Sequence, residues 1–388
     1  VKAAVGIGIP ENKDYNGGIQ EGVSYVQRTT KGRLRVSAAK AFLNPAKKRG
    51  NLSIRTNAHV MRIELEGKRA SAVRYAVGGR HGIEQVVNAR REIILSAGTI
   101  NSPHILQLSG IGPKDLLDDL GIEVKHHLPG VGENLRDHYA PRFTARAKNV
   151  RTINELSRGP RLWAEIGKYL LGKQSIVGLG PTLVYAFWHS NEAVRNHDLQ
   201  LTFAPASYKE GVQSQLDDEP GFTVASWQQR PESLGWVKAR SADPFDKPRI
   251  QPNYLSNEED KRVLLAGMRL CRRIMTAPEL SPYLDFEQYP GEHIQTDDEL
   301  LQVARERGTT TYHLMGACRM GPDSDPTAVV DSDLRVKGIK GLRVADASIM
   351  PTMLSSNLNA GALMIGEKAS DLVLGKKPLE QIIDAIQN

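Results

Sequence analysis

The sequence predicts an α/β (α+β) fold in which a scaffold with a strand-to-helix (βα) unit is interrupted by a large section of antiparallel sheet. Three observations predict it: a strand meander over 51–98, a strand that turns into a helix over 93–112, and strands over 199–204 and 221–228 that polar loops separate. The chain has 388 residues, of which 40% are hydrophobic, so it can bury a large core and form two or three domains.

The meander consists of short apolar strands that glycine turns separate. Gly67-Lys68 and Gly78-Gly79 supply two of these turns, and the meander leads into the apolar run Ile93-Ile94-Leu95. A short apolar run of this kind is typical of a buried strand. We therefore expect the meander to feed directly into a strand of the core.

A helix is expected after this strand, beyond the small residues 96–98. Ser102 is expected as its N-cap and Pro103 as its first residue, while Gly110 and Gly112 end it. Small residues let a ligand approach backbone N–H groups, and the positive end of a helix favours an anion such as pyrophosphate. The spacing alone favours an ordinary βα unit, so the nucleotide site is a hypothesis at this point.

The other periodic segments follow the same rules. A second helix is expected from Pro113 to Leu120, with Gly121 ending it. Helical spacing also covers 259–275, 297–306 and 361–374, and one more strand is expected over 235–240.

The charge pattern argues against nucleic acid as a partner. The chain carries 51 Lys and Arg against 44 Asp and Glu, a formal net charge of +7. The basic residues are spread out, and clusters such as 47–49 and 272–273 have no interleaved aromatic residues for base stacking. No metal site is expected, because His126 and His127 are adjacent and no His/Cys cluster has zinc spacing.

The sequence favours a cytoplasmic protein without a membrane span. No apolar run approaches the ~18 residues that a membrane span needs, and residues 1–10 lack the pattern of a signal peptide. The two cysteines, Cys271 and Cys318, do not suggest a disulfide framework and suit a reducing compartment. Export stays open as an alternative, because the chain begins with Val1 rather than Met.

The amino-acid sequence of the strand-to-helix junction is more specific for a protein family than the spacing of its Gly, Ser and Pro residues. The segment GTINSPHILQLSGIG, from Gly98, resembles the second signature of the glucose-methanol-choline (GMC) flavoprotein oxidoreductases, in particular their choline dehydrogenase-like branch. Other segments resemble the family in the expected order: YNGGIQEG from Tyr15, GRLRVSAAKAFL from Gly32, NLSIRTNAHVMRI from Asn51, LPGVGENLRDH from Leu128, YHLMGACRMG from Tyr312 and GLRVADASIMP from Gly341. The resemblance covers nearly the whole chain and is weakest over 142–251.

The resemblance implies an FAD-binding domain of the Rossmann type with an inserted antiparallel-sheet substrate domain. It assigns 1–20 to a substrate-domain or linker segment, 21–140 and 309–388 to the FAD-binding domain, and 141–308 to the substrate-binding domain. Members of the family open with a strand, GxGxxG and a helix, and no such opening is found here. The FAD-binding domain is therefore expected to be incomplete, with an N-terminal segment cleaved off or carried on a separate chain.

The same resemblance implies which residues contact FAD. The backbone of Val60 is expected to hold the adenine, and the junction residues and the C-terminal flavin motif supply the rest. The expected contacts are Val60, Ser96, Ala97, Gly98, Thr99, Asp346, Ala347, Leu358 and Asn359. For Asp346, which ends an apolar strand, a role as a helix cap or turn residue is the alternative.

The resemblance also implies a catalytic pair in the last eighty residues. His313 stands at the position of the family's catalytic base, and histidine accepts a proton readily near neutral pH. Without the resemblance, a lone histidine between Tyr312 and Leu314 is more often a packed core residue. Asn357 stands where the family has His or Asn, and its amide can hydrogen-bond a substrate oxygen. Its alternative role is to cap the helix that follows.

The function that the resemblance implies is FAD-dependent oxidation of an alcohol to an aldehyde or ketone. His313 takes the hydroxyl proton, Asn357 assists, and the hydride moves to flavin N5. The electron acceptor is expected to be oxygen, a quinone or a dye-like molecule, and no nucleic acid takes part. Two alternatives are kept: a flavin-containing hydroxynitrile lyase, and a truncated, non-catalytic chain that does not hold FAD alone.

Overall fold

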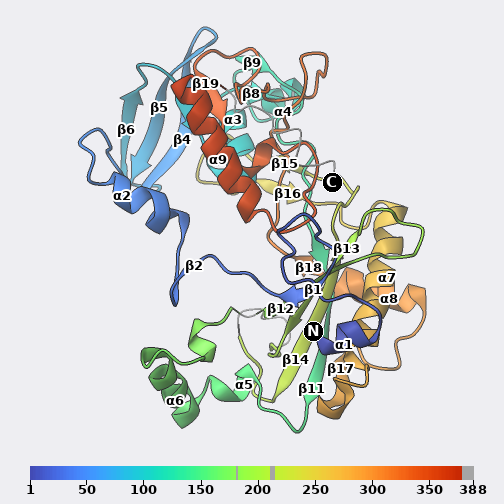
Figure 1. The fold of residues 1–388 in the computed structure, drawn as a ribbon. Coiled ribbons are helices and arrows are strands. Elements are labelled where there is room, and N and C mark those ends of the chain that lie inside the picture. The colour runs from blue at the N-terminus through green and yellow to red at the C-terminus, as the bar shows by residue number, and fades with distance from the viewer. Residues whose placement is uncertain (181, 210–214, 378–388) are drawn as a thin grey trace. The chain divides into compact units, whose positions relative to one another are not determined.

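The computed structural model describes residues 1–180, 182–209 and 215–377. The chain forms two compact units, each built from several stretches of sequence (Figure 1). The sheet unit contains Val1–Leu52, His138–Glu232 and Leu255–Tyr312. The βα unit contains Ser53–Asp137, Ser233–Tyr254 and the chain from His313 onward. The predicted α/β (α+β) class is confirmed.

The sheet unit is built on an antiparallel sheet of six strands. In spatial order the strands are β1 (Gly22–Tyr25), β12 (Val184–Trp188), β13 (Leu199–Ala204), β14 (Gly221–Gln228), β11 (Arg142–Ala147) and β17 (Leu284–Tyr289). The strands expected over 199–204 and 221–228 have the predicted bounds and pair with each other.

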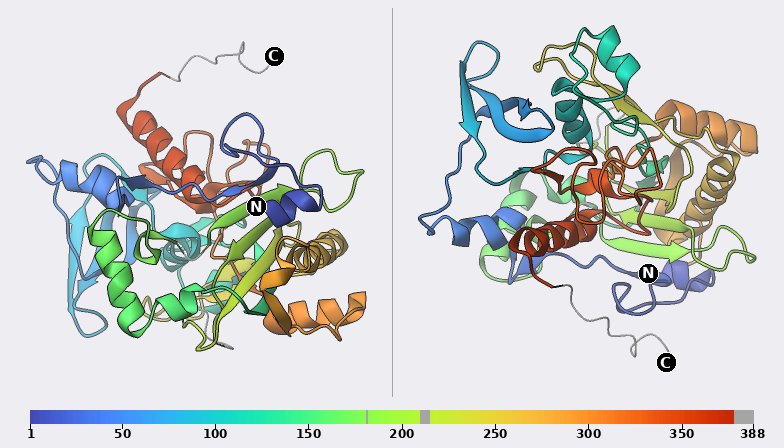
Figure 2. Two further views of the ribbon diagram at one scale, coloured as in Figure 1. Left: turned by 60° about the horizontal axis from the view of Figure 1, so that its bottom comes forward. Right: turned by 90° about the horizontal axis from the view of Figure 1, so that it is seen from above.

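Two helices cover one face of this sheet. The helix α7 (Glu258–Met275) packs against β13 and β14, and α8 (Asp297–Arg307) lies beside α7 (Figure 2). The side chain of Asn257 caps α7, and Thr296 forms a capping box with Glu299 at the start of α8. Apolar side chains that alternate along the strands meet the apolar stripe of α7 in one buried cluster.

Shorter elements complete the sheet unit. They are α1 (Lys2–Gly6), β2 (Thr30–Lys31), β3 (Leu34–Arg35), η1 (Ala39–Leu43), α2 (Asn44–Ala46), β10 (Tyr139–Ala140), α5 (Ile153–Leu156), α6 (Gly159–Leu170), η2 (Ile176–Gly178), η3 (Ser281–Tyr283) and β18 (Thr309–Thr310). The strands β10 and β18 pair with each other just before the chain enters the βα unit at His313.

The βα unit combines the predicted meander with the predicted strand-to-helix junction. The meander is β4 (Ala58–Glu66), β5 (Arg69–Val77) and β6 (Ile83–Asn88), all antiparallel. The junction strand β7 (Ile93–Leu95) pairs in parallel with β19 (Leu342–Val344) and leads into α3 (Gly98–Leu108). A parallel pair joins segments about 250 residues apart, which only the tertiary fold can bring together.

The remaining elements of the βα unit are short, apart from the last helix. They are β8 (Ile111–Gly112), α4 (Lys114–Asp119), β9 (His126–His127), β15 (Trp236–Lys238), β16 (Arg249–Gln251), η4 (Ala347–Ile349) and α9 (Asn359–Leu374). The helices expected over 113–120 and 361–374 are found with ends shifted by one or two residues.

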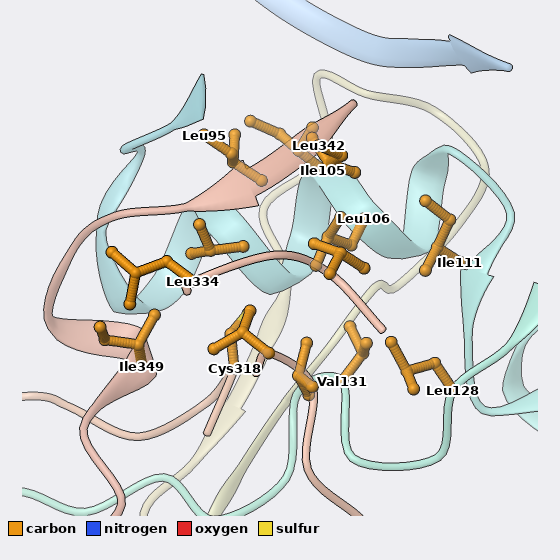
Figure 3. Close-up of a cluster of buried hydrophobic side chains, with 14 of the residues drawn as sticks. Leu95, Ile105, Leu106, Ile111, Leu128, Val131, Cys318, Leu334, Leu342 and Ile349 are labelled. Carbon is orange, nitrogen blue, oxygen red and sulfur yellow. The ribbon is translucent and has the colours of Figure 1, made fainter. Parts of the chain in front are cut away.

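The core of the βα unit lies between α3 and the parallel strand pair. Figure 3 shows Ile105 and Leu106 of α3 close to Leu95 and Leu342, which come from β7 and β19. Cys318 is buried in the same cluster, and burial raises the pKa of its thiol. A buried, protonated thiol of this kind acts as a small apolar side chain.

The predicted start of α3 is wrong. The helix begins at Gly98, whose φ is +82°, so Ser102 is not its N-cap and Pro103 lies inside it. The reason is that the first turn takes its hydrogen-bond acceptor from a distant segment: the Gly98 N–H donates to the carboxylate of Asp346. A cap supplied across the fold leaves no local sequence signal.

The structure places two stretches of the chain in a different unit from the one that the predicted domain ranges gave them. Residues 21–52 lie in the sheet unit, because β1 pairs with β12. Residues 233–254 lie in the βα unit, because β15 packs against α3 and the Gln107 side chain donates to the Val237 carbonyl at 3.0 Å. The strand expected over 235–240 is thus present as β15, outside the six-stranded sheet. Among the described helices, none has the length and apolar character needed to cross a bilayer.

Candidate active site

The βα unit brings His313 and Asn357 together. The Nδ2 atom of Asn357 lies 2.9 Å from Nε2 of His313. His313 lies on the segment that follows β18, and Asn357 lies two residues before α9. The N-cap of α9 is Leu358, and no side chain caps this helix, so Asn357 does not have the alternative capping role. The amide faces the imidazole instead.

A buried carboxylate fixes the backbone of the histidine. The N–H of His313 donates to Oδ1 of Asp137 at 2.9 Å, and the Tyr254 hydroxyl donates to Oδ2 at 2.6 Å. Asp137 is only 4% exposed. Neither Asp137 nor Tyr254 was predicted from the sequence as a site residue. The position of Asp137 near the end of the family segment LPGVGENLRDH could have identified it. No sequence motif points to Tyr254.

Burial decides the charge of the imidazole. Desolvation lowers the pKa of His313 to about 4. The imidazole is therefore neutral at pH 7, with one ring nitrogen able to accept a proton. A neutral histidine next to an amide donor suits removal of a hydroxyl proton, because the amide can bind the same oxygen.

The start of α3 is tied to the histidine segment. The Thr99 hydroxyl donates to the carbonyl of Leu314 at 2.9 Å, next to His313 in the chain. The Ser96 hydroxyl donates to the carbonyl of Ala345 at 2.9 Å, which joins the ends of β7 and β19. One of the expected FAD contacts, Thr99, is therefore hydrogen-bonded to the residue that follows His313.

Asp346 organises this junction. Its Oδ2 accepts hydrogen bonds from the Gly98 N–H at 2.9 Å and from the Ser102 hydroxyl at 2.6 Å. Its Oδ1 accepts from the Ser348 N–H at 2.8 Å, so Asp346 also caps η4, as its alternative role predicts. The anion at the start of α3 is thus a carboxylate of the chain itself, whereas the sequence suggested an anion such as pyrophosphate there.

The other expected FAD contacts differ in their surroundings. An ideal Cβ on Gly98 would meet no atom within 4 Å, so its backbone is open on that side. Val60 lies on β4 where the register with β5 shifts, which is typical of a bulge that leaves backbone groups outside the ladder. Ala347 begins η4, Leu358 is buried and Asn359 begins α9. Over the described ranges, no group of three or more His, Cys, Asp or Glu residues is arranged to hold a metal ion.

Two family models match this chain, both described as GMC oxidoreductase. One matches residues 1–140 and the other residues 231–366. Together they cover the segments that carry Asp137, His313 and Asn357.

Curated relatives match along nearly the whole chain. The "Oxygen-dependent choline dehydrogenase" of Vibrio vulnificus (strain YJ016) is 40% identical over 378 residues, which is 96% of this chain and 66% of the relative. The protein of the same name from Proteus mirabilis (strain HI4320) is 41% identical over 385 residues, 98% of this chain and 68% of the relative. The chain thus spans just under two thirds of the length of the Vibrio relative.

Solved structures agree in fold. A formate oxidase variant from Aspergillus oryzae RIB40, studied for its FAD modification, superimposes with a TM-score of 0.87 at 26% identity. The match covers 96% of this chain and 69% of that chain.

Proposed function

Because this chain belongs to the GMC oxidoreductase family, we propose that it oxidises an alcohol to an aldehyde or ketone with FAD as the hydride acceptor. The observation that carries the proposal is the 2.9 Å contact between His313 Nε2 and Asn357 Nδ2. A neutral imidazole and an amide donor at this separation can share one hydroxyl group.

The residues at the junction of β7 and α3 fit a flavin nucleotide. Gly98 has a positive φ and free space where a Cβ would stand, so a ligand can approach its backbone closely. The backbone of Val60, the stretch 96–99, Asp346 with Ala347, and Leu358 with Asn359 would hold the nucleotide. The Asp346 carboxylate suits hydroxyl groups of the ribityl chain better than phosphates, since like charges repel. When bound, FAD supplies N5 as the acceptor of the substrate hydride.

The chain's own residues would handle the proton. An alcohol that enters between His313 and Asn357 replaces their mutual hydrogen bond by two others. Its O–H donates to Nε2 of His313, and its oxygen accepts from Nδ2 of Asn357. The proton then moves to Nε2 as the hydride leaves the adjacent carbon. Asp137 keeps the histidine segment in place through the His313 N–H.

One of the two alternatives from the sequence, the hydroxynitrile lyase, receives less support. The relatives above are named dehydrogenases, and the structural neighbour is an oxidase, so they do not favour a hydroxynitrile lyase. Choline is the substrate that the names of the relatives indicate, and we propose only the class of alcohols for this chain.

Two measurements on the purified chain test the proposal. Addition of FAD is expected to give the absorbance bands of a bound flavin after removal of free FAD. A panel of alcohols is then expected to bleach these bands under anaerobic conditions. Protein that stays colourless would contradict FAD binding by this chain, and bound flavin that no alcohol reduces would contradict the oxidation.

A further inference from the structure

Backbone strain in this chain occurs next to both residues that donate to the Asp137 carboxylate. A bulky residue with a positive φ is strained, whereas glycine and asparagine adopt this left-handed region more easily. Among the described residues of all other types, those with a positive φ are Leu255, Tyr312 and Leu334, at +59°, +62° and +66°. Leu255 directly follows Tyr254, and Tyr312 directly precedes His313. Two of the three strained residues are therefore chain neighbours of the donors to Asp137.

The strained backbone of Tyr312 is held by two consecutive hydrogen bonds. The N–H of Tyr312 donates to the hydroxyl of Thr310 at 2.8 Å, and the next N–H, that of His313, donates to Oδ1 of Asp137 at 2.9 Å. The Tyr312 side chain is 75% exposed, so its packing does not impose this conformation. Strained residues persist only where their surroundings hold them. Loss of the bond to Asp137 would therefore release the backbone directly before the base.

Tyr254, the other donor to Asp137, also lies in a turn that the fold holds in place. It follows Asn253, whose φ is +54° and whose side-chain amide donates to the Leu234 carbonyl at 2.9 Å. Asp137, Tyr254 and His313 all belong to the βα unit. The Tyr254 hydroxyl donates to Oδ2 of Asp137 at 2.6 Å, and the His313 N–H donates to Oδ1. Tyr254 therefore orients the carboxylate whose other oxygen holds the base.

We propose that Tyr254 is a positioning residue for the proposed oxidation and acts on His313 through Asp137. This inference rests on that oxidation, because it concerns the placement of its base. Tyr254 fixes the carboxylate, and the carboxylate fixes the N–H of His313. Because Tyr312 is strained, the segment relaxes when this hold is weakened, and the imidazole leaves its 2.9 Å contact with Asn357. A displacement of about 1 Å at a reacting group can slow a reaction by about 100-fold.

The rate of flavin reduction by an alcohol tests the role of the Tyr254 hydroxyl. In Tyr254→Phe the limiting rate at saturating alcohol is expected to fall about 10-fold, because the base is less well placed. The alcohol concentration that gives half of this rate is expected to change less than about twofold, since Asn357 still binds the alcohol oxygen. Asp137→Ala is expected to lose about 100-fold in limiting rate. Asp137→Asn keeps an oxygen that can accept from the His313 N–H and should restore the rate to within about threefold of wild type.

Tyr75→Phe is the matched control for Tyr254→Phe. Tyr75 is a buried tyrosine of the same unit, and its hydroxyl donates to the side chain of Gln85 at 2.7 Å. Its loss removes one buried hydroxyl without affecting the support of His313. The limiting rate of Tyr75→Phe is therefore expected to equal that of the wild type.

The pKa of the His313 imidazole provides a readout that does not depend on turnover. NMR of protein labelled in its histidines measures this pKa, and the His313 signal is assigned by its absence in His313→Gln. Burial lowers the wild-type pKa to about 4. In Tyr254→Phe the released imidazole gains water, so its pKa is expected to rise toward 6.5, the ordinary value. Tyr75→Phe is expected to keep the wild-type pKa.

Tyr312→Gly tests the contribution of strain. Glycine adopts a positive φ without steric cost, so the segment before the base has less tendency to relax. Tyr254→Phe is therefore expected to slow flavin reduction by only about threefold relative to Tyr312→Gly alone. An equal effect of Tyr254→Phe in both backgrounds would show that strain at Tyr312 does not contribute.

The outcomes separate this inference from the proposed function. If no alcohol reduces the wild-type flavin, the oxidation is contradicted, while NMR still shows whether Tyr254 controls the surroundings of the imidazole. Equal limiting rates and equal pKa values of His313 in Tyr254→Phe and Tyr75→Phe would overturn the role of Tyr254. Circular dichroism checks that each variant folds. If Tyr254→Phe does not fold, Asp137→Asn and Asp137→Ala make the comparison, and an equal loss of rate in both would overturn the support of His313 by this hydrogen bond.

Discussion

His313 and Asn357 lie 44 positions apart in the sequence, yet Nε2 of one is 2.9 Å from Nδ2 of the other. The imidazole is held through its backbone by Asp137, and the amide comes from the residue just before the N-cap of α9. The hydrogen bond from the His313 N–H to Asp137 and the start of α9 therefore set the separation of the imidazole and the amide. Such positioning is what a base and a hydrogen-bond donor need to act on one oxygen atom.

The rate of flavin reduction should depend on pH through His313. Since the pKa of its imidazole is lowered to about 4, the base is in its neutral form from about pH 5 upward. The rate at saturating alcohol should be flat above pH 5 and fall about tenfold per unit well below pH 4. Stopped-flow absorbance across pH 3–8 measures this limb. A limb centred near 6.5, the ordinary value for histidine, would contradict the effect of burial.

The same shift should make stability depend on pH. In the unfolded chain the imidazole has its ordinary pKa, so the unfolded state binds more protons than the folded state between about pH 4 and 6.5. His313 should therefore make the protein lose stability as the pH falls through this range. Urea unfolding at several pH values measures the slope, and His313→Gln should make it shallower. An unchanged slope would show that other groups cause it.

Asn357 should have a smaller effect on the rate than the histidine. Asn357→Ala removes one hydrogen-bond donor to the alcohol oxygen and should slow flavin reduction by about 3- to 10-fold. Asn357→Asp should instead raise the pKa of His313, because a carboxylate favours the charged imidazole. Its pH profile should then shift to higher pH. An unshifted profile for Asn357→Asp would show that residue 357 does not face the base in solution.

Asp346 should stabilise the start of α3. Asp346→Ala leaves the Gly98 N–H and the Ser102 hydroxyl without their acceptor, which should cost about 2 kcal/mol locally. Hydrogen exchange of the α3 amides measures this loss. Asp331→Ala is the matched control, since Asp331 also accepts two backbone N–H groups, from Asp333 and Arg335, in another turn of the same unit. Equal exchange of α3 in both variants would contradict the role of Asp346.

Local signals predicted most elements of the fold. Four elements match their expected bounds to within one residue: β13, β14, α7 and α8. Their alternation, helical spacing and caps depend on residues that are close together in the sequence. The family motifs located His313 and Asn357. The start of α3 was misplaced because its cap, Asp346, lies 248 residues from Gly98.

The features that the sequence did not predict depend on tertiary contacts. Asp137 was missed because its partner is the backbone N–H of a residue 176 positions away. Tyr254 was missed because only the fold places its hydroxyl on that carboxylate.

Replacement of the histidine tests the catalytic pair most directly. His313→Gln removes the base and keeps a polar side chain next to Asn357. With an alcohol that reduces the wild-type flavin, the variant should retain bound FAD, as its visible spectrum would show. Its anaerobic rate of flavin reduction should fall by about 10²- to 10⁴-fold, the usual contribution of a general base. A variant that binds FAD and is reduced at the wild-type rate would show that His313 does not take the proton.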